Sequence, residues 1–238
     1  MAKVLIDPGH APGNPNRGPT GYYEYAGMWK LSNYLKSALE ARGVAASLTR
    51  TVNQNPSLEQ RGKGAKGYTL FISEHSNAAN GRARGCEVYY SIKRPGNKKH
   101  AAAISAVSAK VMGNPDRGAK TRVGKNNMDY YGVIRNAAAV GCPHVFIVEN
   151  GFHDNAVDEA WLKNDSNLKK LAETQAQALC DVLGVGKGLG KVSDTPSQWA
   201  KDAWEWAQKE GYLDGTRPKD NITREELAAV LERLVKRK

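Results

Sequence analysis

Three short apolar runs in this chain each lead into a residue that can bind a metal ion or transfer a proton. The runs and the residues that follow them are 4–9 and His10, 70–74 and His75, and 145–148 and Glu149. Short runs rich in β-branched residues are typical of buried strands in an α/β sheet. Parallel strands bring their carboxyl ends to one edge, where such folds bind ligands. The sequence therefore predicts that two imidazoles and a carboxylate meet at that edge.

The first 183 residues alternate between strand and helix patterns. Apolar residues at three- and four-residue spacing predict a helix that begins at Glu24 and stops at Gly43, and Ser57 with Gln60 predicts a capped short helix. Further strands are expected at 44–49, 85–91 and 131–135, and further helices at 101–112 and 167–183. This alternation predicts an α/β domain with a mixed, mostly parallel sheet flanked by helices.

A change in composition divides the chain after residue 183. Glycine occupies positions 184, 186, 188 and 190 and alternates with Val, Lys and Leu, which predicts a linker over residues 184–193. Beyond it, a helix over 199–210 and a second one from Thr223 predict a small two-helix module over residues 194–238. A module of this size buries little surface and is marginal alone.

The positive charge of the chain is unevenly distributed. Lys and Arg number 35 against 24 Asp and Glu, a net charge of +11. Residues 194–238 hold nine acidic and nine basic residues, so the whole excess lies in the first part. Such a balance indicates an acidic partner, which could be nucleic acid, anionic lipid or a polyanionic cell wall. Nucleic acid is the weakest of these, because the chain shows no helix-turn-helix or zinc-finger spacing and its basic residues are scattered.

Targeting signals and cysteines give further expectations. No apolar run approaches membrane-spanning length, and no secretion signal precedes the first strand. We therefore expect no membrane partner and a protein made in the cytoplasm.

The chain has three cysteines, Cys86, Cys142 and Cys180, an odd number at wide spacing. They predict buried reduced thiols rather than a disulfide framework or a cysteine zinc site.

Four residues together suggest metal-dependent hydrolysis. Catalytic zinc takes three protein ligands and keeps one position for water, and two histidines with a glutamate are a standard set. His10, Glu24 and His75 can supply it, and Glu149, on a separate strand, suits the base that moves the proton of the water. Each alone also fits a structural role, such as a hydrogen-bonded strand-end histidine or a carboxylate at the positive end of a helix. Taken jointly, they favour a Zn²⁺ site.

The residues around these four carry a family resemblance. In order they are 6–10 (IDPGH), Glu24 at a helix start, 73–78 (SEHSNA), 85–90 (GCEVYY) and 148–152 (VENGF). This order resembles the zinc-dependent N-acetylmuramoyl-L-alanine amidases of the amidase-3 type, over about residues 3–183. The resemblance implies that His10, Glu24 and His75 bind zinc and that Glu149 is the catalytic carboxylate. It also implies cleavage of the amide between the lactyl group of muramic acid and L-alanine in peptidoglycan.

Some neighbouring residues leave alternatives open. Glu74 stands where this family usually has an apolar residue, and strand alternation points it away from the metal, so we expect a non-catalytic carboxylate. Asn77 could bind substrate or bond its own backbone in a turn. Asp7 could orient His10 or form an Asx turn. His153 could line the cleft, but a structural role is favoured.

The tail resembles one S-layer-homology repeat. The matching residues are Trp199, Gly211, 214–218 (DGTRP) and 222–227 (ITREEL). The resemblance implies attachment to an anionic secondary cell-wall polymer, although such repeats commonly act in threes and one is present. Trp199 and Arg224 are the candidate contacts. Trp204 and Trp206 are expected to pack within the module or against a second copy in a homodimer.

These features predict a peptidoglycan amidase resembling a phage or prophage endolysin that lyses a Gram-positive host after release from the cytoplasm. A host autolysin exported by another route is an alternative source. A zinc peptidase that cuts within the stem peptide would use the same ligands, and a non-catalytic wall-binding protein would share the charge and the repeat. A new free amine on L-alanine distinguishes the amidase from both.

Overall fold

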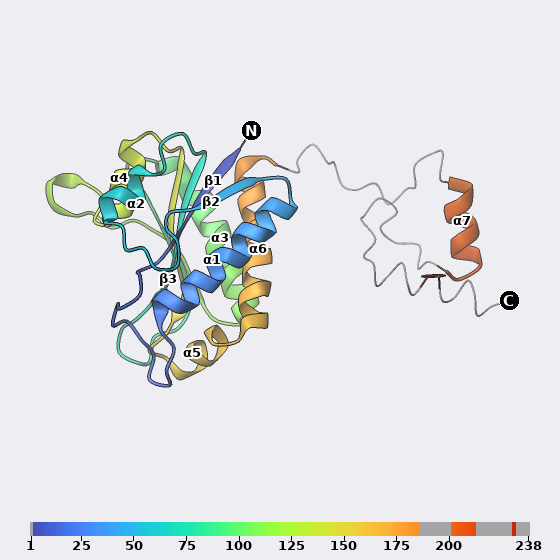
Figure 1. The fold of residues 1–238 in the computed structure, drawn as a ribbon, viewed down its shortest axis with the longest axis horizontal. Helices are drawn as coiled ribbons and strands as arrows, with labels where there is room; N and C mark the ends of the chain where they lie inside the picture. Colours follow the sequence, from blue (N-terminus) through green and yellow to red (C-terminus); the bar gives the residue numbers. More distant parts are fainter. Residues whose placement is uncertain (1, 186–200, 213–229, 232–238) are drawn as a thin grey trace. The chain divides into compact units, whose positions relative to one another are not determined.

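A six-stranded sheet forms the centre of the first 185 residues (Figure 1), and its strand order is β2-β1-β3-β6-β4-β5. The computed structural model describes residues 2–185, 201–212 and 230–231. The chain divides into two compact units, residues 1–185 and 186–238. The strands of the first unit are β1 (Lys3–Pro8), β2 (Ala45–Leu48), β3 (Leu70–Asn77), β4 (Cys86–Tyr90), β5 (Asp116–Lys120) and β6 (His144–Phe152). Its α-helices are α1 (Glu24–Ala41), α2 (Leu58–Lys63), α3 (Lys98–Met112), α4 (Gly132–Ala139), α5 (Ala156–Leu162) and α6 (Asp165–Leu183).

The sheet is mixed and mostly parallel. β2, β1, β3 and β6 run parallel to one another, whereas β4 pairs antiparallel with β6 and parallel with β5. The predicted fold class is therefore confirmed. The carboxyl ends of β1, β3 and β6 lie side by side at one edge, so the residues that follow these strands are brought together.

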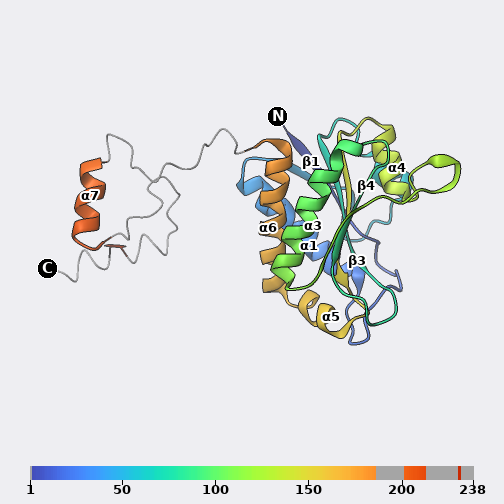
Figure 2. The same ribbon diagram turned by 180° about the vertical axis from the view of Figure 1, so that it is seen from behind.

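Helices cover both faces of the sheet, and strand alternation decides which side chain meets which layer. Val4 and Ile6 of β1 pack in the core beneath α1, α3 and α6. Leu5, between them, packs on the other face with the buried residues of α4. Figure 2 shows the two layers from behind. Burial on both faces explains why the central strands read as continuous apolar runs.

Two predicted helix boundaries rest on local chemistry. Ser57 Oγ accepts from the Gln60 N–H at 3.2 Å, and Gln60 Oε1 accepts from the Ser57 N–H at 2.9 Å, so the capping box of α2 is confirmed. α1 begins at Glu24 as predicted, and Gly43 follows its end with a φ of 75°. A positive φ favours glycine, which explains the stop.

One predicted element is wrong. Residues 131–135 were expected to form a strand, because they include an apolar β-branched pair, but Gly132–Ala139 is helix α4. Its buried residues are Val133, Ile134, Ala137 and Ala138, a spacing that places them on one side of a helix. The run is too short for its period to be recognised in the sequence. The three cysteines are buried free thiols, as predicted.

The described part of the second unit includes helix α7 (Lys201–Lys209), within the helix predicted over residues 199–210. The Trp206 ring lies 5.4 Å from the Tyr212 ring, and Trp206 is 53% exposed. Trp199, Arg224 and the helix expected from Thr223 lie outside the described residues. Among the residues described, no helix combines the length and apolar character needed to cross a membrane.

Candidate active site

His10 is placed by a close approach between two strands. It follows β1 through Gly9, whose N–H donates to the carbonyl of Glu74 at 2.9 Å. A Cβ at Gly9 would lie 2.4 Å from that carbonyl oxygen and 2.8 Å from the His75 ring, so only glycine fits there. His10 itself has a φ of 57°, an uncommon conformation for a residue with a side chain. Such strain at a strand end is typical of functional sites.

Glu24 connects the two histidines. It is 1% exposed in the first turn of α1. Its Oε2 lies 3.1 Å from His10 Nε2, and its Oε1 lies 3.0 Å from His75 Nδ1. Oε2 also accepts from Asn16 Nδ2 at 2.9 Å, and Oε1 accepts from the Ser76 N–H at 3.1 Å. The carboxylate is therefore fixed in position on both sides.

The three predicted ligands converge. One nitrogen or oxygen from each of His10, Glu24 and His75 lies within 4.8 Å of the other two. The two imidazole rings are edge to face, with centroids 5.0 Å apart. The three residues converge although they are far apart in the sequence, because β1 and β3 are neighbours in the sheet and Glu24 reaches both strands from α1.

The geometry and chemistry of these donors fit a zinc ion. Tetrahedral ligands about 2.1 Å from zinc lie roughly 3.4 Å from one another. Glu24 Oε2 lies 3.1 Å from His10 Nε2 and Glu24 Oε1 lies 3.0 Å from His75 Nδ1, and one donor atom from each residue lies within 4.8 Å of the other two, so the donors converge to about the size of a zinc site. Imidazole nitrogens and a carboxylate oxygen are also the ligand types that zinc prefers.

Glu24 is strongly favoured in its ionised form. Burial opposes its ionisation, but hydrogen bonds from His10 and His75 and the charges of both residues outweigh the burial and hold its pKa well below the usual value. An ionised carboxylate between two imidazoles is suited to a cation.

Glu149 faces the same pocket from β6. It lies opposite His75 in the β3–β6 register, and it is 9% exposed. Its Oε2 is buried with no hydrogen-bond partner among the described residues. Burial raises its pKa well above the usual value, and the charges of Glu24, Glu87 and Glu74 add to that effect. An unpartnered buried carboxyl beside three converging donors is a candidate proton carrier.

The three ligand candidates and Glu149 line one cavity of about 380 Å³, which we call the catalytic pocket. Its other lining residues are Asn16, Ser76, Asn77, Ala78, Tyr131, Ile147 and His153. His153 is 3% exposed, and its Nδ1 lies 2.9 Å from Ser76 Oγ, so it both lines the pocket and supports the strand that carries His75. Tyr131 was not recognised from the sequence, because residues 131–135 were assigned to a strand.

Asn77 makes a bond to the neighbouring backbone and also lines the catalytic pocket, so its contact with substrate stays a prediction. Its Oδ1 accepts from the Ala78 N–H at 2.9 Å, as expected of a turn residue, while its side chain also lines the catalytic pocket. Its Nδ2 donates to Glu87 Oε1 at 3.1 Å. Glu87 is held by ion pairs to Arg117 and Lys120. The amide of Asn77 is therefore anchored by the buried carboxylate of Glu87, which two partly exposed cations hold in place.

Asp7 has neither of its expected roles. Its carboxylate accepts from Arg61 Nε at 2.6 Å and Nη2 at 2.9 Å, and from Thr49 Oγ1 and Ser73 Oγ at 2.6 Å each. Asp7 is fully buried and does not contact His10 through any of these bonds. The prediction failed because Arg61, 54 residues away in sequence, was not recognised as a partner.

Glu74 has a partner on the side of β3 away from the pocket. It is fully buried and accepts from Asn150 Nδ2 at 2.7 Å, and Asn150 Oδ1 accepts in turn from Gln175 Nε2 at 2.8 Å. The predicted orientation is confirmed, since Glu74 does not line the catalytic pocket. Burial raises its pKa to about 8, against hydrogen bonds from Asn150 and Gln175 that lower it.

Glu74→Gln is expected to stabilise the protein at alkaline pH. A carboxyl whose pKa is raised on folding contributes stability that is present below the unfolded pKa and is lost as pH rises through the folded one. For Glu74 that loss runs from about pH 4.5 to about pH 8. In denaturant unfolding at pH 9, the variant should exceed wild type by up to about 5 kcal/mol, and at pH 4 the two should agree. A variant with the same pH profile as wild type would contradict a buried Glu74.

Comparison with known proteins identifies the family. The family model for N-acetylmuramoyl-L-alanine amidase, Amidase_3, matches residues 4–181. The sporulation-specific N-acetylmuramoyl-L-alanine amidase of Bacillus subtilis (strain 168) is 29% identical over 200 residues, which cover 81% of this chain and 74% of that protein. The endolysin of Bacillus phage SPP1 is 31% identical over 213 residues, which cover 83% of this chain and 73% of that protein.

A solved structure agrees with this assignment. The catalytic domain of CwlV, an N-acetylmuramoyl-L-alanine amidase from Bacillus (Paenibacillus) polymyxa var. colistinus, matches with a TM-score of 0.67 and 27% identity. The match covers 78% of this chain and 99% of that domain. The fold, the converging pocket and the sequence match agree, and the chain belongs to the Amidase_3 family of N-acetylmuramoyl-L-alanine amidases.

Proposed function

We propose that this chain hydrolyses the amide between the lactyl group of N-acetylmuramic acid and L-alanine in peptidoglycan, with a zinc ion held by His10, Glu24 and His75. The observation that carries the proposal is the convergence of these three side chains within 4.8 Å, in a pocket that Glu149 also lines. When bound by these ligands, zinc would supply Lewis-acid chemistry: it would polarise a carbonyl oxygen and lower the pKa of water.

Glu149 is the proton carrier in this proposal. Its unpartnered Oε2 accepts a proton from the attacking water, and the protonated carboxyl then donates it to the nitrogen of L-alanine as the amide bond breaks. Its raised pKa suits both halves of the transfer, because a carboxylate with a raised pKa is a stronger base toward water and, once protonated, remains close enough to return the proton. Asn77 hydrogen-bonds the substrate in this proposal, which its position in the wall of the catalytic pocket and its bond to Glu87 support.

Product analysis tests the reaction. Purified sacculi digested with the protein should gain free amines on L-alanine and no other new terminus. New amines on a residue within the stem or the cross-bridge would instead indicate a peptidase.

We further propose that the enzyme acts as an endolysin, made in the cytoplasm and acting on the wall of a Gram-positive host after release. Its similarity to the phage SPP1 endolysin and its net charge of +11, which suits an anionic wall, support this role. Expression in a Gram-positive host should lyse cells only after the membrane is permeabilised. Lysis or wall release in intact, unpermeabilised cells would favour an exported autolysin.

The C-terminal module is proposed to hold an anionic secondary wall polymer through Trp199 and Arg224. The support is the repeat-like sequence over residues 199–227. Arg224→Ala should weaken co-sedimentation with sacculi that carry the polymer and leave binding to stripped sacculi unchanged. A monomer–dimer shift in the variant, with wall binding retained, would assign the module to self-association instead.

A further inference from the structure

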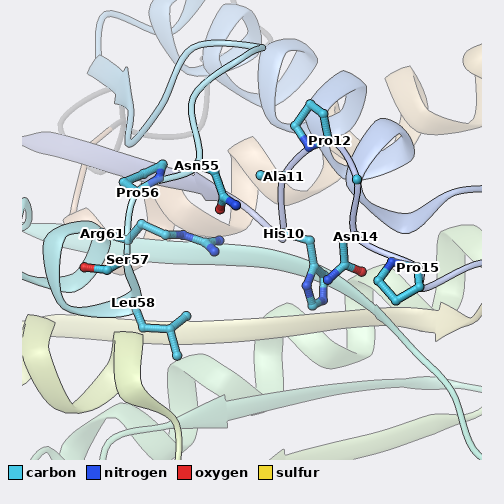
Figure 3. Close-up of a pocket in the computed structure, with 11 residues that line it drawn as sticks. His10, Ala11, Pro12, Asn14, Pro15, Asn55, Pro56, Ser57, Leu58 and Arg61 are labelled. Carbon is cyan, nitrogen blue, oxygen red and sulfur yellow. The ribbon is translucent and has the colours of Figure 1, made fainter.

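A second cavity adjoins the catalytic pocket. It has a volume of about 510 Å³ and lies between the loop after β1 and the segment that begins α2 (Figure 3). We call it the outer pocket. His10 lines both cavities, so a ligand held at the catalytic centre can continue into the outer pocket without leaving the protein surface. The walls include Pro12, Pro15 and Pro56, whose fixed backbone φ restricts the conformations of the segments that carry them.

One cationic side chain reaches this cavity. Figure 3 shows the guanidinium of Arg61 extending toward His10, beside Asn55. Its Nε and Nη2 bind Asp7, and Nη2 also donates to the Pro8 carbonyl at 2.9 Å. The remaining nitrogen, Nη1, has no hydrogen-bond partner among the described residues. The Asp7 pair fixes the guanidinium, so Nη1 is a preorganised donor.

The charge around Arg61 is not balanced by Asp7 alone. Arg50 is 4% exposed and donates to the same Pro8 carbonyl at 3.4 Å. Its Nη2 is buried without a partner in the part of the chain that the structure describes. Two guanidinium groups therefore share one nearby carboxylate, and Asp7 is also committed to Thr49 and Ser73. The local excess of positive charge favours an anionic group in the outer pocket.

The neutral walls suit a peptide. Asn14, Asn55 and Ser57 bring amide and hydroxyl groups to the cavity, and Leu58 adds an apolar surface that is 55% exposed. By contrast, Tyr131 lines the catalytic pocket but not the outer one, and its ring lies 5.2 Å from Tyr130 and 4.9 Å from Tyr89. Aromatic faces suit sugar rings, whereas a guanidinium suits a carboxylate. The aromatic cluster at Tyr131 therefore suits the glycan, and the guanidinium of Arg61 suits the peptide.

We propose that the outer pocket binds the peptide stem of the substrate, and that Arg61 Nη1 hydrogen-bonds the free α-carboxylate of its second residue. This inference rests on the proposed amidase function. An extended chain advances about 3.3–3.6 Å per residue, so that carboxylate lies roughly 7 Å from the scissile nitrogen. The outer pocket shares His10 with the catalytic pocket, so it is the cavity that this carboxylate can reach.

Two muramoyl tetrapeptides test the proposal: one with the α-carboxylate of the second residue free, and one with it amidated. Wild-type protein should cleave the free acid with a kcat/KM about tenfold higher, the effect of one charge-assisted hydrogen bond. Arg61→Lys keeps a cation beside Asp7 but loses the second arm of the fork. It should reduce the preference to about twofold or less, with the loss in KM.

Asn55→Ala provides a variant that cannot disturb the Asp7 pair. Asn55 is exposed, and its side chain makes no hydrogen bond among the described residues. We expect a several-fold rise in KM for both tetrapeptides, with kcat and thermal unfolding unchanged. Arg61→Lys with the full tenfold preference would overturn the assignment of Arg61. A KM in Asn55→Ala that is unchanged on tetrapeptides but rises with glycan length would place the glycan in the outer pocket.

The same experiment separates this inference from the function on which it rests. Equal kcat/KM for the two tetrapeptides in wild type, with cleavage at the lactyl amide, overturns the carboxylate assignment and leaves the amidase function standing. Cleavage at a different amide overturns the amidase function and, with it, the occupant named for the outer pocket.

Discussion

Glu149→Gln is expected to lower kcat by about a thousandfold while leaving zinc content unchanged. General acid–base catalysis contributes about 10²–10⁴ in rate, and glutamine can neither accept nor return the proton. Glu149 is not among the three converging donors, so metal binding should survive its replacement. The rate is measured as release of free L-alanine amines from sacculi, with metal content determined on the same preparation.

The stability of this variant provides an internal check. Burial, with the charges of Glu24, Glu87 and Glu74, raises the pKa of Glu149, so its ionisation opposes folding as pH rises through that pKa. In the presence of chelator, Glu149→Gln should therefore unfold at a higher denaturant concentration than wild type at pH 8. Glu173→Gln, at an exposed position of α6, is the matched control and should change neither rate nor stability by much. Retention of a tenth or more of the wild-type kcat in Glu149→Gln would remove Glu149 from the mechanism.

His75→Ala is expected to abolish activity through loss of the metal. Groups that only support metal ligands commonly change affinity by about 10–100-fold, so removal of a ligand should cost more than about a hundredfold. Competition with a chromophoric chelator measures the zinc affinity of wild type and variant. The loss of activity should be partly reversed at high zinc concentration if the remaining two ligands still bind.

His144→Ala serves as the matched control for that loss. His144 is a half-buried histidine at the start of β6 that hydrogen-bonds Asn97 at 2.9 Å and lies opposite Leu70, at the other end of the β3–β6 pair from His75. Its replacement should leave zinc affinity within about twofold. Equal affinities in wild type and His75→Ala would contradict the ligand assignment, and a large loss in His144→Ala would indicate a different metal site.

Much of the candidate site could be predicted from the sequence, because residues that follow buried parallel strands meet at one edge of the sheet. His10, His75 and Glu149 follow buried apolar runs, and parallel pairing of β1, β3 and β6 brings their ends together. Glu24 was found because a helix start places its carboxylate in the first turn. These positions depend on local patterns and on one rule of sheet topology.

The remaining features depend on contacts that sequence patterns do not encode. The pairing of Asp7 with Arg61 joins residues 54 positions apart, and nothing in either segment indicates the other. The helix at Gly132–Ala139 was missed because a short apolar run fits a strand or a buried helix equally well. That error also hid Tyr131, which lines the catalytic pocket just before the helix. The outer pocket exists only once the loop after β1 and the start of α2 are placed side by side.

The most direct test of the account is a zinc titration of the purified protein with lysis followed in parallel. Protein stripped by chelator should be folded and inactive, and activity on sacculi should return linearly until one zinc is bound per chain. Full activity in protein that contains no metal, or recovery that requires two ions per chain, would contradict a single zinc held by His10, Glu24 and His75.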